Sequence, residues 1–190
     1  METGLENLNS LLEELGLKSR GMYLPSSITG GKPRAVIPLR SNSQFPEISQ
    51  PLVRRLIVSY GQGPEDIGIM VTTPGSNIIN MLEMKPGPSS DEMATALTTL
   101  LVGTLDVASG VKVSRADNKI SVKVSHPRLK NDDNSWVVRS LGSPIASVVA
   151  SLLAETLDKP ILVKKEGQHR ADSFIELEIL NHLHEEQNVK

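Results

Sequence analysis

The segment from residue 141 to residue 157 constrains the fold more than any other part of the sequence. It reads LGSPIASVVASLLAETL, and no residue between Pro144 and Ala154 is charged. Ser143 is suited to cap a helix, and Pro144 to occupy the first helical position, where its missing N–H has no cost. A helix that is apolar on nearly every side belongs in a core or an interface. The sequence therefore predicts a central helix that other elements surround.

Small residues recur at intervals of four along one side of this helix, at Ala146, Ala150 and Ala154. Such a stripe lets another element approach closely. Tight packing inside the chain is the more frequent outcome. The more specific hypothesis is an apolar pocket or a homodimer interface. The residues expected to form this interface or pocket are Ala146, Val149, Ala150, Leu153 and Ala154.

Regular elements flank the central helix on both sides. A helix is predicted over 91–108, where Ser89 and Glu92 fit a capping box, and hairpins are predicted over 111–125 and 161–180. Apolar and polar residues alternate in the hairpin strands, which is typical of an antiparallel sheet with one face in water. The second half is thus expected in the order αββαββ. The predicted fold class is α+β, with an antiparallel or mixed sheet and helices on one face.

The first half of the chain is less regular. Leucines at helical spacing over 5–15 predict an amphipathic helix that packs on its own domain or docks on a partner. Residues 35–39 are expected to be extended, with Pro38 placing them at an edge strand or at a strand end. The spacing over 46–60 predicts a helix, with a strand as the alternative for its β-rich end. Residues 18–34 are expected to be a loop.

The strongest internal boundary is KPGPSS at 85–90. Three segments are therefore expected. Residues 1–88 form a separate α/β domain or an extension of the same sheet, residues 89–180 form the α+β domain, and residues 181–190 form a polar tail.

The best local candidate for a polar ligand site is the turn that follows a predicted buried strand at 67–71. A strand, a small-residue turn and a helix start can hold an anion on free N–H groups. The candidate ligand-binding residues before a short helix at 77–83 are Thr72, Thr73, Gly75 and Ser76. The alternative is that Ser76 merely caps that helix.

Composition bounds the function. The 190 residues carry a net charge of −2 with no cysteine and one tryptophan, so we expect no nucleic-acid partner and no thiolate metal site. The four histidines are scattered, and no catalytic motif, metal site or cofactor fingerprint stands out. The N-terminus lacks the pattern of a signal peptide, and no apolar run reaches the roughly 20 residues of a membrane span. A cytoplasmic protein without a membrane span is expected.

The second half also resembles a known family. The pattern consists of a hairpin ending in VKVSHP, the helix LGSPIASVVASLLAETL and a closing FIELEIL strand. It is similar to the vinyl-reductase-like hydrocarbon-binding domains and, more distantly, to TRAPP-type trafficking subunits, over residues 89–180. The resemblance implies an α+β fold, commonly dimeric, that binds small apolar or aromatic molecules. The cysteines frequent near the closing hairpin of the bacterial domains are absent from KKEGQHRADSF, so no role that depends on them carries over.

These observations predict a non-enzymatic accessory domain that binds a small apolar ligand and acts as a homodimer. One alternative is an α/β enzyme that binds an anionic substrate at the 72–77 turn. Another is a structural subunit of a larger complex, with a protein partner on the N-terminal helix.

Overall fold

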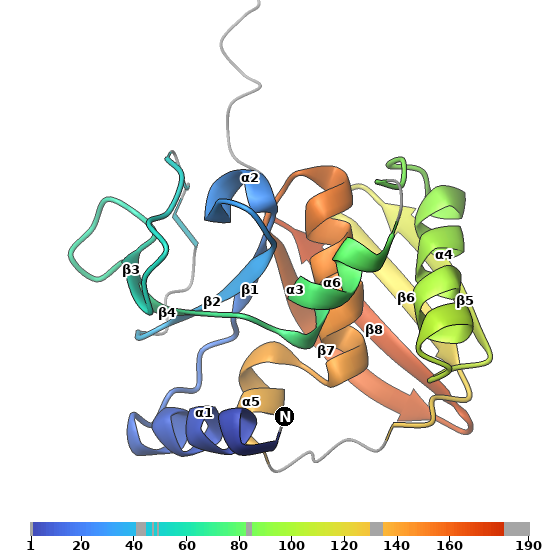
Figure 1. Cartoon of the computed structure of the whole chain (residues 1–190), viewed down its shortest axis with the longest axis horizontal. Helices are drawn as coiled ribbons and strands as arrows, with labels where there is room; N and C mark the ends of the chain where they lie inside the picture. Colours follow the sequence, from blue (N-terminus) through green and yellow to red (C-terminus); the bar gives the residue numbers. More distant parts are fainter. Residues whose placement is uncertain are drawn as a thin grey trace, which may run out of the picture.

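One antiparallel sheet runs through the protein (Figure 1). The computed structural model describes residues 2–40, 45–46, 48, 50–82, 85–129 and 135–180. Within them the sheet has eight strands in the order β3-β4-β2-β1-β7-β8-β6-β5. The strands are β1 (Met22–Leu24), β2 (Arg34–Pro38), β3 (Ile57–Ser59), β4 (Ile67–Val71), β5 (Gly110–Ala116), β6 (Lys119–Ser125), β7 (Ile161–His169) and β8 (Asp172–Ile179). Strands from both sides of residue 88 therefore share one sheet, with β1 paired to β7.

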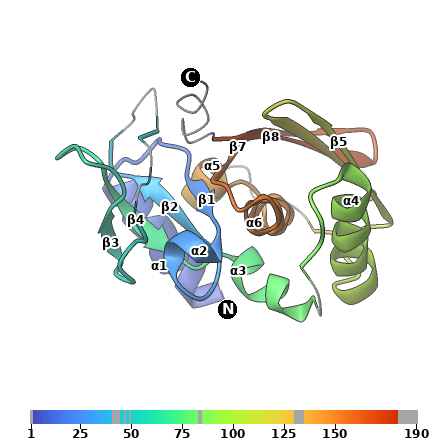
Figure 2. The same ribbon diagram turned by 90° about the horizontal axis from the view of Figure 1, so that it is seen from above.

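Helices cover one side of this sheet in its second half, where α4 and α6 lie on the same side of β5, β7 and β8 (Figure 2). The helical elements are α1 (Glu2–Glu14), α2 (Ser26–Thr29), α3 (Pro74–Ile78), η1 (Ile79–Met81), α4 (Ser90–Thr98), η2 (Thr99–Thr104), α5 (Trp136–Leu141) and α6 (Pro144–Leu157). The predicted α+β class is confirmed. The order αββαββ is not, because α5 adds a helix before α6.

The central helix α6 forms where the sequence places it. The Ser143 hydroxyl accepts a hydrogen bond from the Ala146 N–H at 3.1 Å, and Pro144 is the first helical residue. Most of α6 is buried against α3, β7, β1 and α4. The uncharged helix α6 is therefore part of the hydrophobic core of this chain, as its apolar composition predicts.

The capping box of α4 is also present. The Glu92 N–H and the Ser89 hydroxyl are 3.3 Å apart, and the Glu92 carboxylate accepts in return from the Ser89 N–H. The helix continues as the π-helical segment η2 and ends at Thr104, four residues before the predicted end at 108.

Several expectations for the first half were wrong. Strand β1 and the short helix α2 lie in the segment predicted to be a loop. Strand β2 is not an edge strand, because it pairs with β1 on one side and with β4 on the other. Pro38 instead ends β2, the position that the alternative prediction allowed, where a missing N–H is tolerated.

The helix predicted over 46–60 is not found in the described residues of that range. Residues 50–56 form no regular helix, and β3 follows, so the strand alternative holds for Ile57–Ser59. Helix α3 begins at Pro74 rather than at residue 77. The predicted polar tail, residues 181–190, lies outside the described residues.

The sheet separates two apolar clusters. The larger one lies on the helical side and includes α6, the inner face of the β5–β8 strands and residues from α1. The smaller one lies on the other side of the first four strands, where apolar side chains of residues 45–60 cover it. Its buried members are Met22, Leu24, Val36, Ile48, Val58, Tyr60 and Met70.

The N-terminal helix packs within the chain. Leu12 of α1 is completely buried, Leu8 and Leu11 pack against the larger core, and α1 packs against α5. Helices α5 and α6 together form a stretch, Trp136–Leu157, that is long and apolar enough to cross a membrane, so the expectation that no apolar run reaches this length was wrong. Most of this stretch is buried inside the fold.

Candidate functional site

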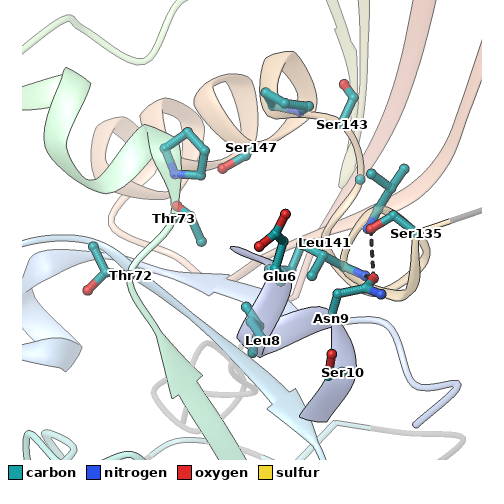
Figure 3. Close-up of a pocket in the computed structure, with 15 residues that line it drawn as sticks. Glu6, Leu8, Asn9, Ser10, Thr72, Thr73, Ser135, Leu141, Ser143 and Ser147 are labelled. Atoms are coloured by element: carbon teal, nitrogen blue, oxygen red, sulfur yellow. Dashed lines mark hydrogen bonds between the residues drawn. The ribbon is translucent and has the colours of Figure 1, made fainter. Parts of the chain in front are cut away.

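A pocket of about 380 Å³ opens where α1 meets the first turns of α3, α5 and α6 (Figure 3). Its wall combines apolar side chains with hydroxyl groups. The lining residues are Glu6, Leu8, Asn9, Ser10, Thr72, Thr73, Pro74, Ser135, Val137, Val138, Leu141, Gly142, Ser143, Pro144 and Ser147. This volume lies within the range of small-molecule sites, which are typically apolar with a few placed polar groups.

A carboxylate of the sheet occupies the start of α6. Glu166 on β7 accepts a hydrogen bond from the Ser143 N–H at 2.9 Å and a second from the Ser143 hydroxyl. A carboxylate at a helix N-terminus is stabilised by the helix dipole and by free N–H groups. The position that an incoming anion would take at α6 is therefore filled by the protein itself.

The start of α5 is capped from α1. The side-chain oxygen of Asn9 accepts from the Ser135 hydroxyl at 2.9 Å (Figure 3). It also accepts from the Trp136 N–H at 2.8 Å and from the Val137 N–H at 3.4 Å. One amide side chain thus fixes α1 on α5 and satisfies the first turn of α5.

The start of α3 is closed by its own hydroxyl groups. The Thr73 N–H donates to the Ser76 hydroxyl at 2.9 Å, and the Gly75 N–H lies 3.5 Å from the Ser147 hydroxyl of α6. Helices α3 and α6 touch closely here, because a Cβ at Gly75 would lie only 2.5 Å from the Ser147 carbonyl oxygen. The N–H groups that could have held an anion at this turn are engaged.

A buried tyrosine hydroxyl, that of Tyr23, lies beside the pocket. The Tyr23 hydroxyl donates to the Leu141 carbonyl at 2.7 Å, and its side chain is completely buried. Burial raises the pKa of Tyr23 far above its ordinary value, while a hydrogen bond with Ser147 acts in the opposite direction. Tyr23 is therefore a neutral hydrogen-bond donor and cannot act as a base near neutral pH.

The pocket includes part of the predicted polar turn. Thr72 and Thr73 line it, whereas Gly75 and Ser76 are buried between α3 and α6. Ser76 is not the N-cap that the alternative assigned to it. The N-cap of α3 is Thr73, and Ser76 is the third helical residue, whose hydroxyl accepts from the Thr73 N–H in a capping box.

The residues of α6 that were predicted to form an interface or pocket do not line this pocket. Their side chains are completely buried, and α6 contributes Ser143, Pro144 and Ser147 to the pocket wall in their place. The residues predicted to form an interface or pocket, Ala146, Val149, Ala150, Leu153 and Ala154, belong to the larger core. They offer no exposed surface to a second copy of the chain.

Sequence reasoning did not identify the contribution of α1 or the serines of α6. Asn9 lies one residue after Leu8 on the apolar side of α1, and Ser143, Ser147 and Ser151 recur at intervals of four along α6. A polar residue on an apolar helix face and a regular serine stripe were the available signals. The partners of these residues lie on other helices and strands. The sequence signals therefore predicted that a contact exists, but not which residue forms its other half.

Among the described residues, no group of three or more His, Cys, Asp or Glu side chains is placed to hold a metal ion. Glu6 is the single ionisable side chain in the described pocket wall. An acid–base pair is therefore not assembled there by these residues.

Comparison with known proteins gives one match. Searches against curated proteins and against solved structures find none. A family model described as "Domain of unknown function (DUF7982)" matches residues 1–179, a span that includes both halves of the sheet and every wall of the pocket. The chain belongs to this family.

Proposed function

We propose that this protein is a non-enzymatic domain that binds a small molecule in the pocket between α1 and the first turns of α3, α5 and α6. The pocket itself carries the proposal. It is about 380 Å³ in volume, and its wall is predominantly apolar, with Leu8, Val137, Val138 and Leu141 among the lining side chains. Hydroxyl groups of Thr73 and Ser147 supply the polar contacts that orient a ligand.

Binding fits this wall better than catalysis does. The described lining holds one ionisable group, and the buried tyrosine nearby stays protonated. The resemblance of residues 89–180 to hydrocarbon-binding domains points in the same direction. An anionic substrate at the 72–77 turn has less support, because the helix starts around the pocket already hold their own carboxylate, amide and hydroxyl caps.

Native mass spectrometry of the purified protein, compared with the denatured mass, tests the proposal. We expect the native protein to carry a small molecule that denaturation releases. Val138→Trp, which fills the pocket from α5, and Ser10→Trp, which fills it from the exposed side of α1, should both remove that mass. Val53→Trp, at a side chain that is 67% exposed outside the pocket wall, should retain it.

Two results would contradict the proposal. One is wild-type protein that is bare as purified and binds no added small molecule at this wall. The other is a retained molecule that remains in both filled variants. Circular dichroism of each variant identifies a loss of mass that comes from unfolding rather than from filling.

A further inference from the structure

The charge of the pocket wall bears on what the pocket can hold. Glu6 projects from α1 into the space bounded by Thr73, Ser147 and Leu141 (Figure 3). It is the only charged side chain among the described lining residues. A second carboxylate, that of Glu166, lies just behind Ser143. The charged side chains described in and beside this wall are therefore both carboxylates.

Glu6 differs from the carboxylates of Glu155, on α6, and Glu166, at the start of α6. Glu166 accepts two hydrogen bonds from Ser143, and Glu155 accepts two from Ser26. Across the described part of the chain, no ion pair or hydrogen bond engages Glu6. Its charge is thus available to a molecule in the pocket, whereas the charges of Glu155 and Glu166 serve the fold.

The nearest features that could favour an anion are already used. The N–H groups of Trp136 and Val137 point at Asn9, and the Ser143 N–H points at Glu166. The first residue of both α3 and α6 is proline, which has no N–H to offer. In the described wall no lysine, arginine or histidine compensates for Glu6.

We propose that the ligand of this pocket is an organic cation, an ammonium group on a small apolar body. The ammonium pairs with the Glu6 carboxylate and donates to the hydroxyl groups of Thr73 and Ser147. The apolar body lies against Leu8, Val137 and Leu141. This inference rests on the proposed function and narrows it to one class of ligand. An ammonium donates three hydrogen bonds and accepts none, and this wall is rich in acceptors.

Three probes that share one apolar body test the inference: 2-phenylethylammonium, 2-phenylethanol and phenylacetate. Each is titrated into the 15N-labelled full chain, and dissociation constants are taken from amide shifts of pocket residues such as Val138 and Ser147. We expect the ammonium to bind about fivefold more tightly than the alcohol, as for an exposed ion pair, and phenylacetate to bind more weakly than either. Raising the salt concentration should reduce the preference for the ammonium.

Glu6→Gln is the matched variant, because it keeps the size of the side chain on an exposed helical position and removes its charge. It should abolish the preference for the ammonium while leaving the affinity for 2-phenylethanol unchanged. Glu13→Gln, also exposed on α1 but outside the pocket wall, is the control and should keep the wild-type preference.

The outcomes separate the two claims. Equal binding of the three probes to the wild type, with no effect of Glu6→Gln, would overturn the cation inference and leave the pocket as a binding site. Tighter binding of phenylacetate would overturn it as well. If no probe shifts the pocket amides and the native protein carries no molecule, the proposed function fails, and the inference fails with it.

Discussion

The side of the sheet that faces away from α4 and α6 meets two different environments along its width. Over β1, β2 and β4 this side is dry, because Met22, Val36 and Met70 are at most 2% exposed beneath apolar side chains of residues 45–60. Over β6, β7 and β8 the same side is open and charged. There Lys123 pairs with Asp172, Lys164 pairs with Glu178, and 41% of Phe174 is exposed beside Lys123.

The contrast explains why an alternating pattern revealed β8 and not β1. In β8, buried Ile175, Leu177 and Ile179 alternate with more exposed residues, so the period of two is visible. In β1 all three residues are buried, because both faces are covered. A strand of three apolar residues has no alternation to detect. Hydrophobic periodicity therefore reports a strand only where one of its faces meets water.

The largest effect is expected from placing one charge on each half of this side. Val36→Glu puts a carboxylate between Met22 and Met70, where burial without a partner should cost more than about 3 kcal/mol of unfolding free energy. Phe174→Glu puts the same group beside Lys123 in water and should cost less than about 1 kcal/mol. Urea denaturation measures both. Equal losses of unfolding free energy in the two variants would show that the side over β1, β2 and β4 is not more buried than the side over β6, β7 and β8.

A smaller effect is expected where the first half is fastened to α6. Glu155 accepts from the Ser26 N–H at 2.8 Å and from the Ser26 hydroxyl at 2.6 Å, and so caps α2 from a distant helix. Glu155→Ala should lower the unfolding free energy by about 1 kcal/mol, the usual value of a helix cap. Glu176→Ala, on the open side of β8, is the matched control and should change it little. Similar changes in unfolding free energy for the two variants would show that the cap formed by Glu155 does not stabilise the fold.

The smallest effect belongs to the charges of the open side. The hydrogen bond and ion pair with Lys123 hold the pKa of Asp172 below its ordinary value of 3.8. A lowered folded-state pKa stabilises the fold above the ordinary value, and this contribution is lost as the pH falls through the lowered pKa. Asp172→Asn should therefore lower the melting temperature slightly at about pH 6 and not at about pH 2. An equal decrease at both values would mean that the charge of Asp172 is not responsible.

The candidate site shows the same division between what can and cannot be predicted. Thr72 and Thr73 were found from the strand and turn that precede α3, and both line the pocket. Glu6 was not found, although it is the one charged lining residue described, because a glutamate on an amphipathic helix ordinarily faces water. At the predicted polar turn, the Thr73 N–H donates to the Ser76 hydroxyl, and the Gly75 N–H lies 3.5 Å from the Ser147 hydroxyl of a different helix. The contact with Ser147 could not be predicted from the local sequence.

Interactions within a few residues determined what the sequence alone could establish. Ser143 and Pro144 set the start of α6, and Ser89 with Glu92 set the start of α4, because capping joins groups three residues apart. Tertiary structure alone decided the rest. Asn9 caps α5 across 127 residues of chain, and β1 pairs with β7 in the middle of the sheet. Local pattern cannot show such contacts, because each partner becomes a neighbour only after the chain has packed.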